Sequence, residues 1–292
     1  MTLTYSDERQ MSDDEFQLIR DFIYGHCGIY FDSNSRYILE KRLSHRLIDL
    51  SLASFFDYYN YLKYNHKKDT ELMDIMDVIT TNETYFFRES FQLKAFSDEI
   101  IPELIRIKSA KGNRSLRIWS AGCSTGEEPY SIAMLLGDIP ELKEWNIEII
   151  GTDISQKVVQ HARRAVYGKS SFRATEDLQL SLFFDQLDDC YRVKDYIREQ
   201  VTISHLNLFD SNRLLMLGKM DIIFCRNVII YFDQAAKKRL IESFYSSLYD
   251  GGFLLLGHSE SLMNLTTHFK LRHFKNDMVY QKPDRFSSGG AR

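Results

Sequence analysis

The sequence predicts an α/β protein: an open, doubly wound sheet with helices on both faces, preceded by a domain made only of helices. Two observations predict this fold. Strand-length apolar runs at 116–119, 147–150 and 220–225 are each followed by a turn and a helical pattern, as in repeated βα units. Residues 12–80 instead carry helical periodicity.

Composition and charge are those of an ordinary globular protein. The 292 residues are 44% hydrophobic, and a net charge of −4 argues against bulk binding to nucleic acid. The four cysteines form no Cys-x-x-Cys pair, which indicates reduced thiols in the cytoplasm and no metal site. The polar N-terminus predicts no signal peptide, and no apolar run approaches the roughly 18 residues of a membrane span.

The N-terminal helices can be placed from their start and stop signals. Ser12 precedes three acidic residues, a usual helix start, and Gly25 and Gly28 are expected to end this helix. Further helices are predicted over 35–50 and 71–79.

The helix predicted over 35–50 carries the densest basic cluster in the chain. Its members are Arg36, Lys41, Arg42, His45 and Arg46. Such a cluster is usually a solvated face. In an acidic chain, however, a docking surface for an acidic partner is a second interpretation.

The first βα unit has a loop built almost wholly from small residues, which lets another molecule approach the backbone closely. Its glycines, Gly122 and Gly126, lack the G-x-G-x-x-G spacing that seats a pyrophosphate. Glu127 and Glu128 at the helix start would repel a phosphate and suit hydroxyls or a cationic amine. S-adenosylmethionine has both groups. An ordinary βα turn with acidic helix-dipole residues explains this stretch equally well.

Polar residues follow the next two strands where a doubly wound sheet binds its ligand. Asp153 ends the strand at 147–150 and is placed to bind ribose hydroxyls, although it could also help to cap the following helix. Arg226 and Asn227 come directly after the strand at 220–225. We expect these side chains to lie at one edge of the sheet.

The segment at 80–89, TTNETYFFRE, links the two parts of the chain. It is either a connector with aromatic plugs or a lid that offers Asn82, Thr84 and the guanidinium of Arg88 to a ligand. An amphipathic helix is predicted over 91–111.

Two antiparallel hairpins are predicted in the α/β part. Strands at 191–193 and 196–203, after a turn at 185–189, predict a small hairpin. A second hairpin over 269–282 would close the sheet. We expect the last residues, 285–292, to be flexible.

Six segments together resemble one family, the CheR-type chemotaxis receptor methyltransferases. They are TTNETYFFRE (80–89), WSAGCSTGEEPYSIAM (119–134), GTDIS (151–155), NLFD (207–210), IIFCRNVIIYFD (222–233) and GHSESL (257–262). All six occur in order, and the similarity covers nearly the whole chain.

This resemblance implies a class I S-adenosylmethionine-dependent methyltransferase with a helical N-terminal domain. The implied boundaries are 12–80 for the helical domain, 81–92 for a linker or lid, 93–284 for the methyltransferase domain with a small β-subdomain at about 182–206, and 285–292 for a tail. The implied reaction transfers a methyl group to glutamate side chains on the cytoplasmic helices of chemoreceptors, with S-adenosylhomocysteine as second product.

The resemblance also assigns site residues. The implied cofactor site comprises Asn82, Thr84, Arg88, Glu128, Asp153, Asn207, Leu208, Arg226 and Asn227. Arg88 and Tyr231 would lie closest to the reacting methyl, although Tyr231 could equally be a core aromatic. A glutamate side chain is already ionised at neutral pH, so no general base is required.

Further expectations concern partners. Arg36, Arg42 and Arg46 are docking candidates for acidic receptor helices. Some family members bind a C-terminal receptor peptide with the β-subdomain. The short acidic turn at 185–189 lacks their glycine-rich loop, so we expect an enzyme that does not depend on such a tether. We also expect it to be monomeric and cytoplasmic and to reach receptor arrays through protein contacts. The alternatives are a methyltransferase with another acceptor and a non-catalytic signalling module that binds the cofactor.

Overall fold

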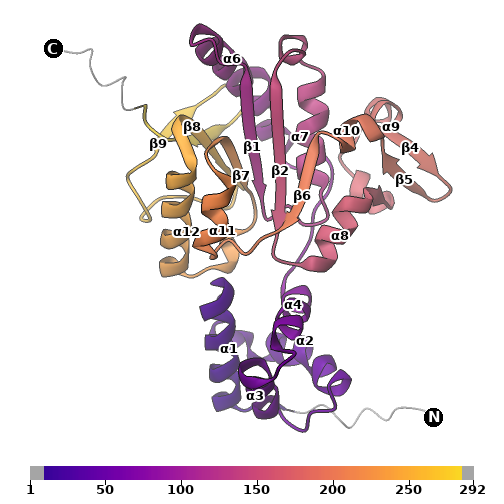
Figure 1. Ribbon diagram of the computed structural model, residues 1–292, viewed down its shortest axis with the longest axis vertical. Helices are drawn as coiled ribbons and strands as arrows, with labels where there is room; N and C mark the ends of the chain where they lie inside the picture. Colours follow the sequence, from indigo (N-terminus) through magenta and orange to yellow (C-terminus); the bar gives the residue numbers. More distant parts are fainter. Residues whose placement is uncertain (1–9, 285–292) are drawn as a thin grey trace.

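The computed structural model describes residues 10–284, which form a helical domain and an α/β domain joined by a linker (Figure 1). The helical domain comprises α1 (Asp13–Cys27), α2 (Arg36–Asp49), α3 (Phe55–Tyr64) and α4 (Lys68–Ile79). The flexible tail predicted at 285–292 lies outside the described residues. Within residues 10–284, no helix combines the length and apolar character needed to cross a bilayer.

Helix α1 begins as its sequence predicts but ends later. The Ser12 hydroxyl accepts the Glu15 N–H while the Glu15 carboxylate accepts the Ser12 N–H, which forms a capping box. The prediction that Gly25 ends the helix is wrong, because the helix continues to Gly28, which has a φ of 74°. Cys27, beyond Gly25, is buried in the domain core, so packing offsets the roughly 1 kcal/mol that a helical glycine costs.

A seven-stranded sheet forms the centre of the α/β domain. Its strands, in order across the sheet, are β6 (Val201–His205), β2 (Asn146–Asp153), β1 (Ser115–Ala121), β7 (Met220–Cys225), β8 (Leu248–Leu256), β10 (Met278–Gln281) and β9 (Lys270–His273). The first five are parallel, and β10 pairs antiparallel with both β8 and β9. The doubly wound sheet and its closing hairpin are therefore confirmed.

Alternation along β1 sends side chains into two separate cores. Ile118 packs in the core under α5 (Ser90–Ala95), α6 (Ile101–Ala110) and α7 (Glu127–Gly137), whereas Trp119 packs with α11 (Ser211–Leu217) and α12 (Gln234–Ser247). The single helix predicted over 91–111 is interrupted by a π-helical turn, Phe96–Ile100, between α5 and α6. Helices therefore cover both faces of the sheet (Figure 1).

A small antiparallel sheet projects from the domain beside β6 (Figure 1). It consists of β3 (Val166–Tyr167), β5 (Cys190–Val193) and β4 (Phe184–Leu187). Helix α8 (Gln156–Arg164) precedes β3, and α9 (Asp177–Phe183) lies between β3 and β4 in the chain. The hairpin therefore consists of β4 and β5. The turn predicted at 185–189 is wrong because β4 occupies most of that range, and the hairpin strand predicted at 196–203 is wrong as well. Residues 195–198 form a short helix, α10, and β6 pairs parallel with β2 in the main sheet. The alternating pattern of 196–203 could not reveal which strand would become its partner.

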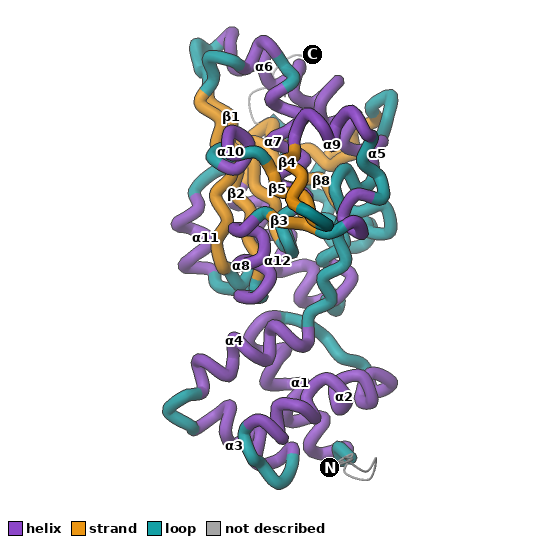
Figure 2. The backbone as a smooth tube through the Cα atoms, turned by 90° about the vertical axis from the view of Figure 1, so that its right-hand side faces the viewer, coloured by secondary structure: helices purple, strands orange, loops and turns teal. Residues whose placement is uncertain are grey.

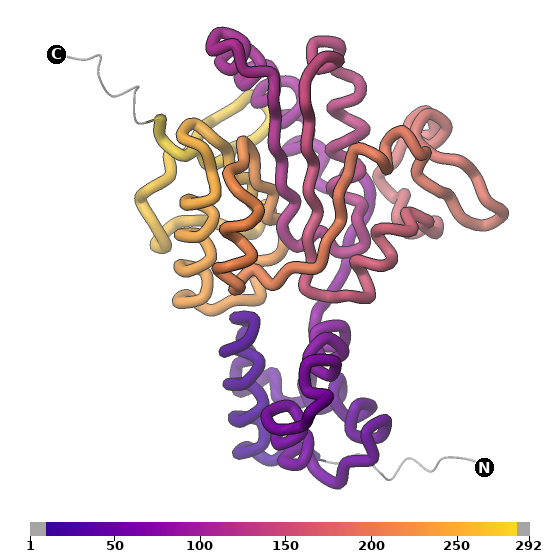
Figure 3. The backbone as a smooth tube through the Cα atoms, in the orientation of Figure 1, coloured from indigo at the N-terminus to yellow at the C-terminus, as the bar shows by residue number. Residues whose placement is uncertain are grey.

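The helical domain contacts the carboxyl edge of the main sheet (Figure 2). Side-chain hydrogen bonds join the domains, among them Tyr24 Oη to Asp233 at 3.0 Å, Ser155 Oγ to Asp77 at 2.6 Å, and Asn207 Nδ2 to the carbonyl of His26 at 2.7 Å. The linker connects the two domains at this edge of the sheet (Figure 3). This arrangement encloses the sheet edge where the predicted site residues lie.

Candidate functional site

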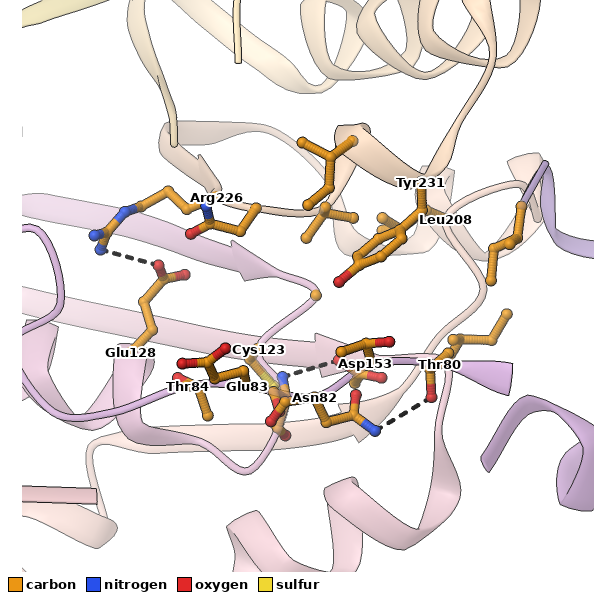
Figure 4. Close-up of a pocket in the computed structure, with 18 of the residues that line it drawn as sticks. Thr80, Asn82, Glu83, Thr84, Cys123, Glu128, Asp153, Leu208, Arg226 and Tyr231 are labelled. Carbon is orange, nitrogen blue, oxygen red and sulfur yellow. Dashed lines mark hydrogen bonds and ion pairs between the residues drawn. The ribbon is translucent and has the colours of Figure 1, made fainter. Parts of the chain in front are cut away.

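A pocket opens at the carboxyl ends of β1, β2 and β7, between the sheet, the linker and the helical domain (Figure 4). It is lined by every residue predicted for the cofactor site or for catalysis: Asn82, Thr84, Arg88, Glu128, Asp153, Asn207, Leu208, Arg226, Asn227 and Tyr231. These residues come from sequence positions up to 149 apart, and the fold gathers them in one cavity. Their individual roles remain predictions.

The small-residue loop after β1 forms the floor of this pocket. Gly122 has a φ of 80°, and a Cβ placed there would lie 2.5 Å from Val228. Gly126 begins α7 with a φ of 96°. A side chain at either glycine would therefore strain the loop, and the bare backbone stays open to a ligand.

Asp153 holds this loop and still faces the pocket. Its two carboxylate oxygens accept the N–H of Ser124 at 2.8 Å and the N–H of Ser155 at 2.9 Å. Burial raises the pKa of the Asp153 carboxyl above its ordinary value, and these backbone donors counteract part of that shift. Because a carboxylate has about four acceptor sites, Asp153 can also accept ribose hydroxyls.

Arg226 lies at the centre of a buried polar network. Its guanidinium is 3.2 Å from the carboxylates of both Glu128 and Glu89, and it donates to the carbonyl of Arg88. Ser120 donates to the second oxygen of Glu128 at 2.6 Å. Burial raises the pKa of Glu128, and Arg226 offsets part of this effect. Arg226 is therefore already neutralised and organises the pocket wall (Figure 4).

The linker contributes a second wall. The carbonyl of Asn82 accepts the hydroxyl of Ser124 at 3.2 Å, which ties the linker to the loop after β1. The guanidinium of Arg88 donates to the carbonyl of Glu83 at 2.8 Å. Thr84 lies between these contacts and lines the pocket. The linker is therefore an ordered part of the site, bonded to both sides of the pocket.

Tyr231 and Asn227 come from the segment after β7. The Tyr231 ring lines the pocket and its hydroxyl points into it, away from the core (Figure 4). Asn227 has a φ of 58°, and its buried Oδ1 has no hydrogen-bond partner among residues 10–284. This oxygen is therefore an unused acceptor beside the pocket.

Glu260, in the GHSESL segment, has a structural role that the sequence does not reveal. Its carboxylate accepts backbone N–H groups of Asn227 at 2.8 Å, Gly257 at 2.8 Å and Ile230 at 3.3 Å. It therefore fixes the segment that carries Arg226, Asn227 and Tyr231 against the loop after β8. An acid that bonds only to backbone leaves no pairwise signal in a sequence.

The helical domain also lines the pocket, through Cys27, Ile29 and Ile79. These residues were not predicted as site residues, since an apolar residue at a domain boundary looks like any core residue in the sequence. Asn207 contributes to this wall too, because its amide bonds to His26. The site is complete only when both domains are in place.

The three docking candidates on α2 differ in their surroundings. Arg46 bonds to the buried carboxylate of Glu71 at 2.6 Å and to Asp74 at 2.7 Å. Arg42 donates to the carbonyl of Ile79, at the start of the linker, and Arg36 pairs with a largely exposed aspartate. The contacts of Arg46 therefore favour a structural role, whereas Arg36 stays accessible to a partner.

The donor and acceptor groups of the pocket fit S-adenosylmethionine better than a phosphorylated nucleotide. Asp153, Glu128 and the unused oxygen of Asn227 are acceptors, and they match the hydroxyl and ammonium donors of this cofactor. The Arg226 guanidinium, which a phosphate would require, is already paired with two carboxylates.

Comparisons with known proteins agree with this geometry. The family model for the CheR methyltransferase SAM binding domain matches residues 82–278, and the model for the CheR methyltransferase all-alpha domain matches residues 14–80. The chain is 37% identical to chemotaxis protein methyltransferase 2 of Vibrio cholerae over 97% of both chains. It is 36% identical to a chemotaxis protein methyltransferase of Borreliella burgdorferi, over 85% of this chain and 88% of that protein. It is 33% identical to chemotaxis protein methyltransferase 1 of Pseudomonas aeruginosa, over 91% and 97% respectively.

Proposed function

The chain belongs to the CheR methyltransferase family and is an S-adenosylmethionine-dependent methyltransferase of chemotaxis, and we propose that its acceptors are glutamate side chains of chemoreceptors. The products would be glutamate methyl esters and S-adenosylhomocysteine.

One observation carries the proposal of a carboxylate acceptor. Arg88 and Tyr231, the residues expected beside the reacting methyl, line the same pocket as Asp153 and Glu128. A guanidinium at that position orients a carboxylate by donating hydrogen bonds to its oxygens. The described pocket lining contains no histidine, the side chain most often used as a general base, and a carboxylate nucleophile needs no base.

The chemistry then reduces to positioning. The bound cofactor supplies an activated methyl group: as a carboxylate oxygen bonds to the methyl carbon, the carbon–sulfur bond breaks and its electron pair stays on sulfur. Asp153 would bind the ribose, and Arg226 and Glu128 would keep the wall beside the amino-acid portion rigid. Arg88 would orient the acceptor, and Tyr231 would exclude water from the methyl.

We further propose that the enzyme works as a cytoplasmic monomer and reaches receptor arrays through protein contacts. Arg36, Arg42 and Arg46 on α2 remain the docking candidates, and the exposure of Arg36 gives it the most support. The turn of the β4–β5 hairpin contains Asp188 and Asp189 and no glycine. This composition supports docking without a receptor peptide on the small sheet.

The first test is incubation of the protein with S-adenosylmethionine labelled on its methyl group and membranes that carry the host's chemoreceptors. Base-labile label on the receptor is expected, because carboxyl methyl esters hydrolyse in base. Cofactor binding without receptor labelling would contradict the proposed acceptor. Label that resists base would indicate methylation of a different functional group.

A further inference from the structure

At the rim of the pocket, Arg88 of the site belongs to a cluster whose other members have so far been given no role. Its members are Glu83 and Arg88 from the linker, Tyr85 between them, and Arg173 from the segment before α9. The Arg173 guanidinium lies 2.7 Å from the Glu83 carboxylate and 3.8 Å from the centre of the Tyr85 ring. Arg88 lies over the same ring at 5.7 Å. Two guanidinium groups therefore share one aromatic ring.

This rim cluster lies at the boundary between pocket and solvent. Glu83, Tyr85 and Arg88 line the pocket, yet the side chains of Glu83 and Arg173 are 68% and 50% exposed. An acceptor that reaches Arg88 from this side of the pocket would pass close to these groups. Because Glu83 is a carboxylate, it occupies Arg173 in the way that an entering glutamate would.

Arg173 is held in place by rigid neighbours although its own head group is exposed. The backbone N–H of Phe86 donates to the carbonyl of Ser171 at 2.9 Å, and the Phe86 ring stacks on Phe172 at 5.3 Å. The hydroxyl of Ser171 in turn donates to the buried carboxylate of Glu127 at 2.9 Å. These bonds fix the segment that carries Arg173 against the linker, so the guanidinium is preorganised for an anion.

We propose that Arg173 recognises the acceptor carboxylate, or an acidic neighbour of it on the same helix, by exchanging Glu83 for that carboxylate. The proposal rests on the proposed receptor substrate and names a specificity residue for it. The exchange keeps the number of charge-assisted hydrogen bonds constant, because a pair between Arg173 and the acceptor replaces the pair between Arg173 and Glu83. The need for this exchange also disfavours acceptors without a negative charge, because they cannot replace the ion pair that Arg173 forms with Glu83.

The test compares Arg173→Ala with a matched control, Arg114→Ala. Arg114 also pairs with one glutamate at 2.7 Å, is 61% exposed, and precedes β1 at the opposite end of the sheet. Initial rates are measured while receptor and S-adenosylmethionine are varied separately, and cofactor affinity is measured by calorimetry. We expect Arg173→Ala to raise the KM for receptor about threefold to tenfold, with kcat and cofactor affinity unchanged. Arg114→Ala should behave as wild type.

A second pair of variants separates recognition from simple charge neutralisation. Glu83→Gln alone should lower the KM for receptor, because Arg173 is then free, and Glu83→Gln/Arg173→Ala should keep the high KM of Arg173→Ala. Return of the double variant to the wild-type KM would overturn the proposal, since Arg173 would then only mask Glu83. Equal KM values for Arg173→Ala and Arg114→Ala would also overturn it. Wild-type protein that binds cofactor but labels no receptor would instead contradict the proposed function itself.

Discussion

The pocket contains two arginine–glutamate clusters that use the same chemical groups at opposite levels of exposure. The Arg226 side chain is 2% exposed and bonds to two carboxylates that are themselves largely buried. Arg173 is 50% exposed and bonds to one carboxylate that solvent reaches freely. Water screens the outer pair, so its loss has little effect on folding, whereas removal of one member of the inner group leaves buried charge unpaired. The inner cluster can therefore maintain the site and the outer one can exchange partners.

The largest effect expected from this comparison is that of Arg226→Met. The free energy of unfolding should fall by about 3–5 kcal/mol, because Glu128 and Glu89 would remain buried without their cation. Urea denaturation measures this loss, and Arg117→Met is the control, since Arg117 pairs with the half-exposed Glu148. A loss below about 1 kcal/mol would show that the inner network relaxes or fills with water.

A similar group in the helical domain gives the next effect. Arg46→Met should lower the free energy of unfolding by about 2–3 kcal/mol, because Glu71 is buried and would lose its cation. The KM for receptor should not change under conditions where the variant is folded. Arg36→Ala, which removes an exposed pair, is the control for stability alone, because Arg36 is itself a proposed docking residue. A raised KM with unchanged stability would restore Arg46 as a docking residue.

Glu260→Gln tests whether a carboxylate bonded only to backbone belongs to the inner group. The variant offers one acceptor oxygen and places an NH₂ group among N–H donors, so we expect a loss of about 1–3 kcal/mol in stability. Cofactor affinity should fall about tenfold, because the segment with Asn227 loses its anchor. Calorimetry at constant pH measures the affinity. Unchanged binding would show that this segment is held by strand β7 alone.

Glu128→Gln should change stability by about 1 kcal/mol or less at neutral pH, since an amide can still accept from Arg226 and donate to Ser120. The pH dependence is more informative. The pKa of Glu128 is higher in the folded protein than its ordinary value of 4.5, so protonation of this carboxyl stabilises the fold fully at pH values below 4.5. This contribution to stability is lost as the pH rises through the raised pKa. The stability of wild type relative to the variant should therefore decrease as pH rises from 4.5 towards 7. A flat difference would contradict the shift.

The smallest effect on stability is expected at the rim. Arg173→Ala should leave the urea midpoint of unfolding close to that of wild type, as is usual when an exposed ion pair is removed. The same variant is expected to change the KM for receptor, so stability and recognition separate at this residue. A shift of the midpoint as large as that of Arg226→Met would instead place Arg173 with the inner cluster.

Local patterns in the sequence were sufficient for the parallel strands β1, β2 and β7, most helices and part of the pocket. Apolar runs followed by small or polar residues predict β1, β2 and β7, and the carboxyl ends of adjacent parallel strands meet by geometry. Asp153 and Arg226 could therefore be assigned to one site before any contact was known. The family resemblance added Asn207, Leu208, Tyr231 and the acceptor class, which no pattern of periodicity contains.

Only the tertiary structure decided which strand pairs with which and which charges are paired. The period of two in 196–203 is the same for a hairpin strand and for the edge strand β6, so the partner depends on the packing of the whole sheet. Arg46 and Arg36 look alike in the sequence, yet one bonds to buried Glu71 and the other stays exposed. Residue type and spacing fix the available chemistry, but burial sets the strength of a charge, and burial is a property of the folded chain.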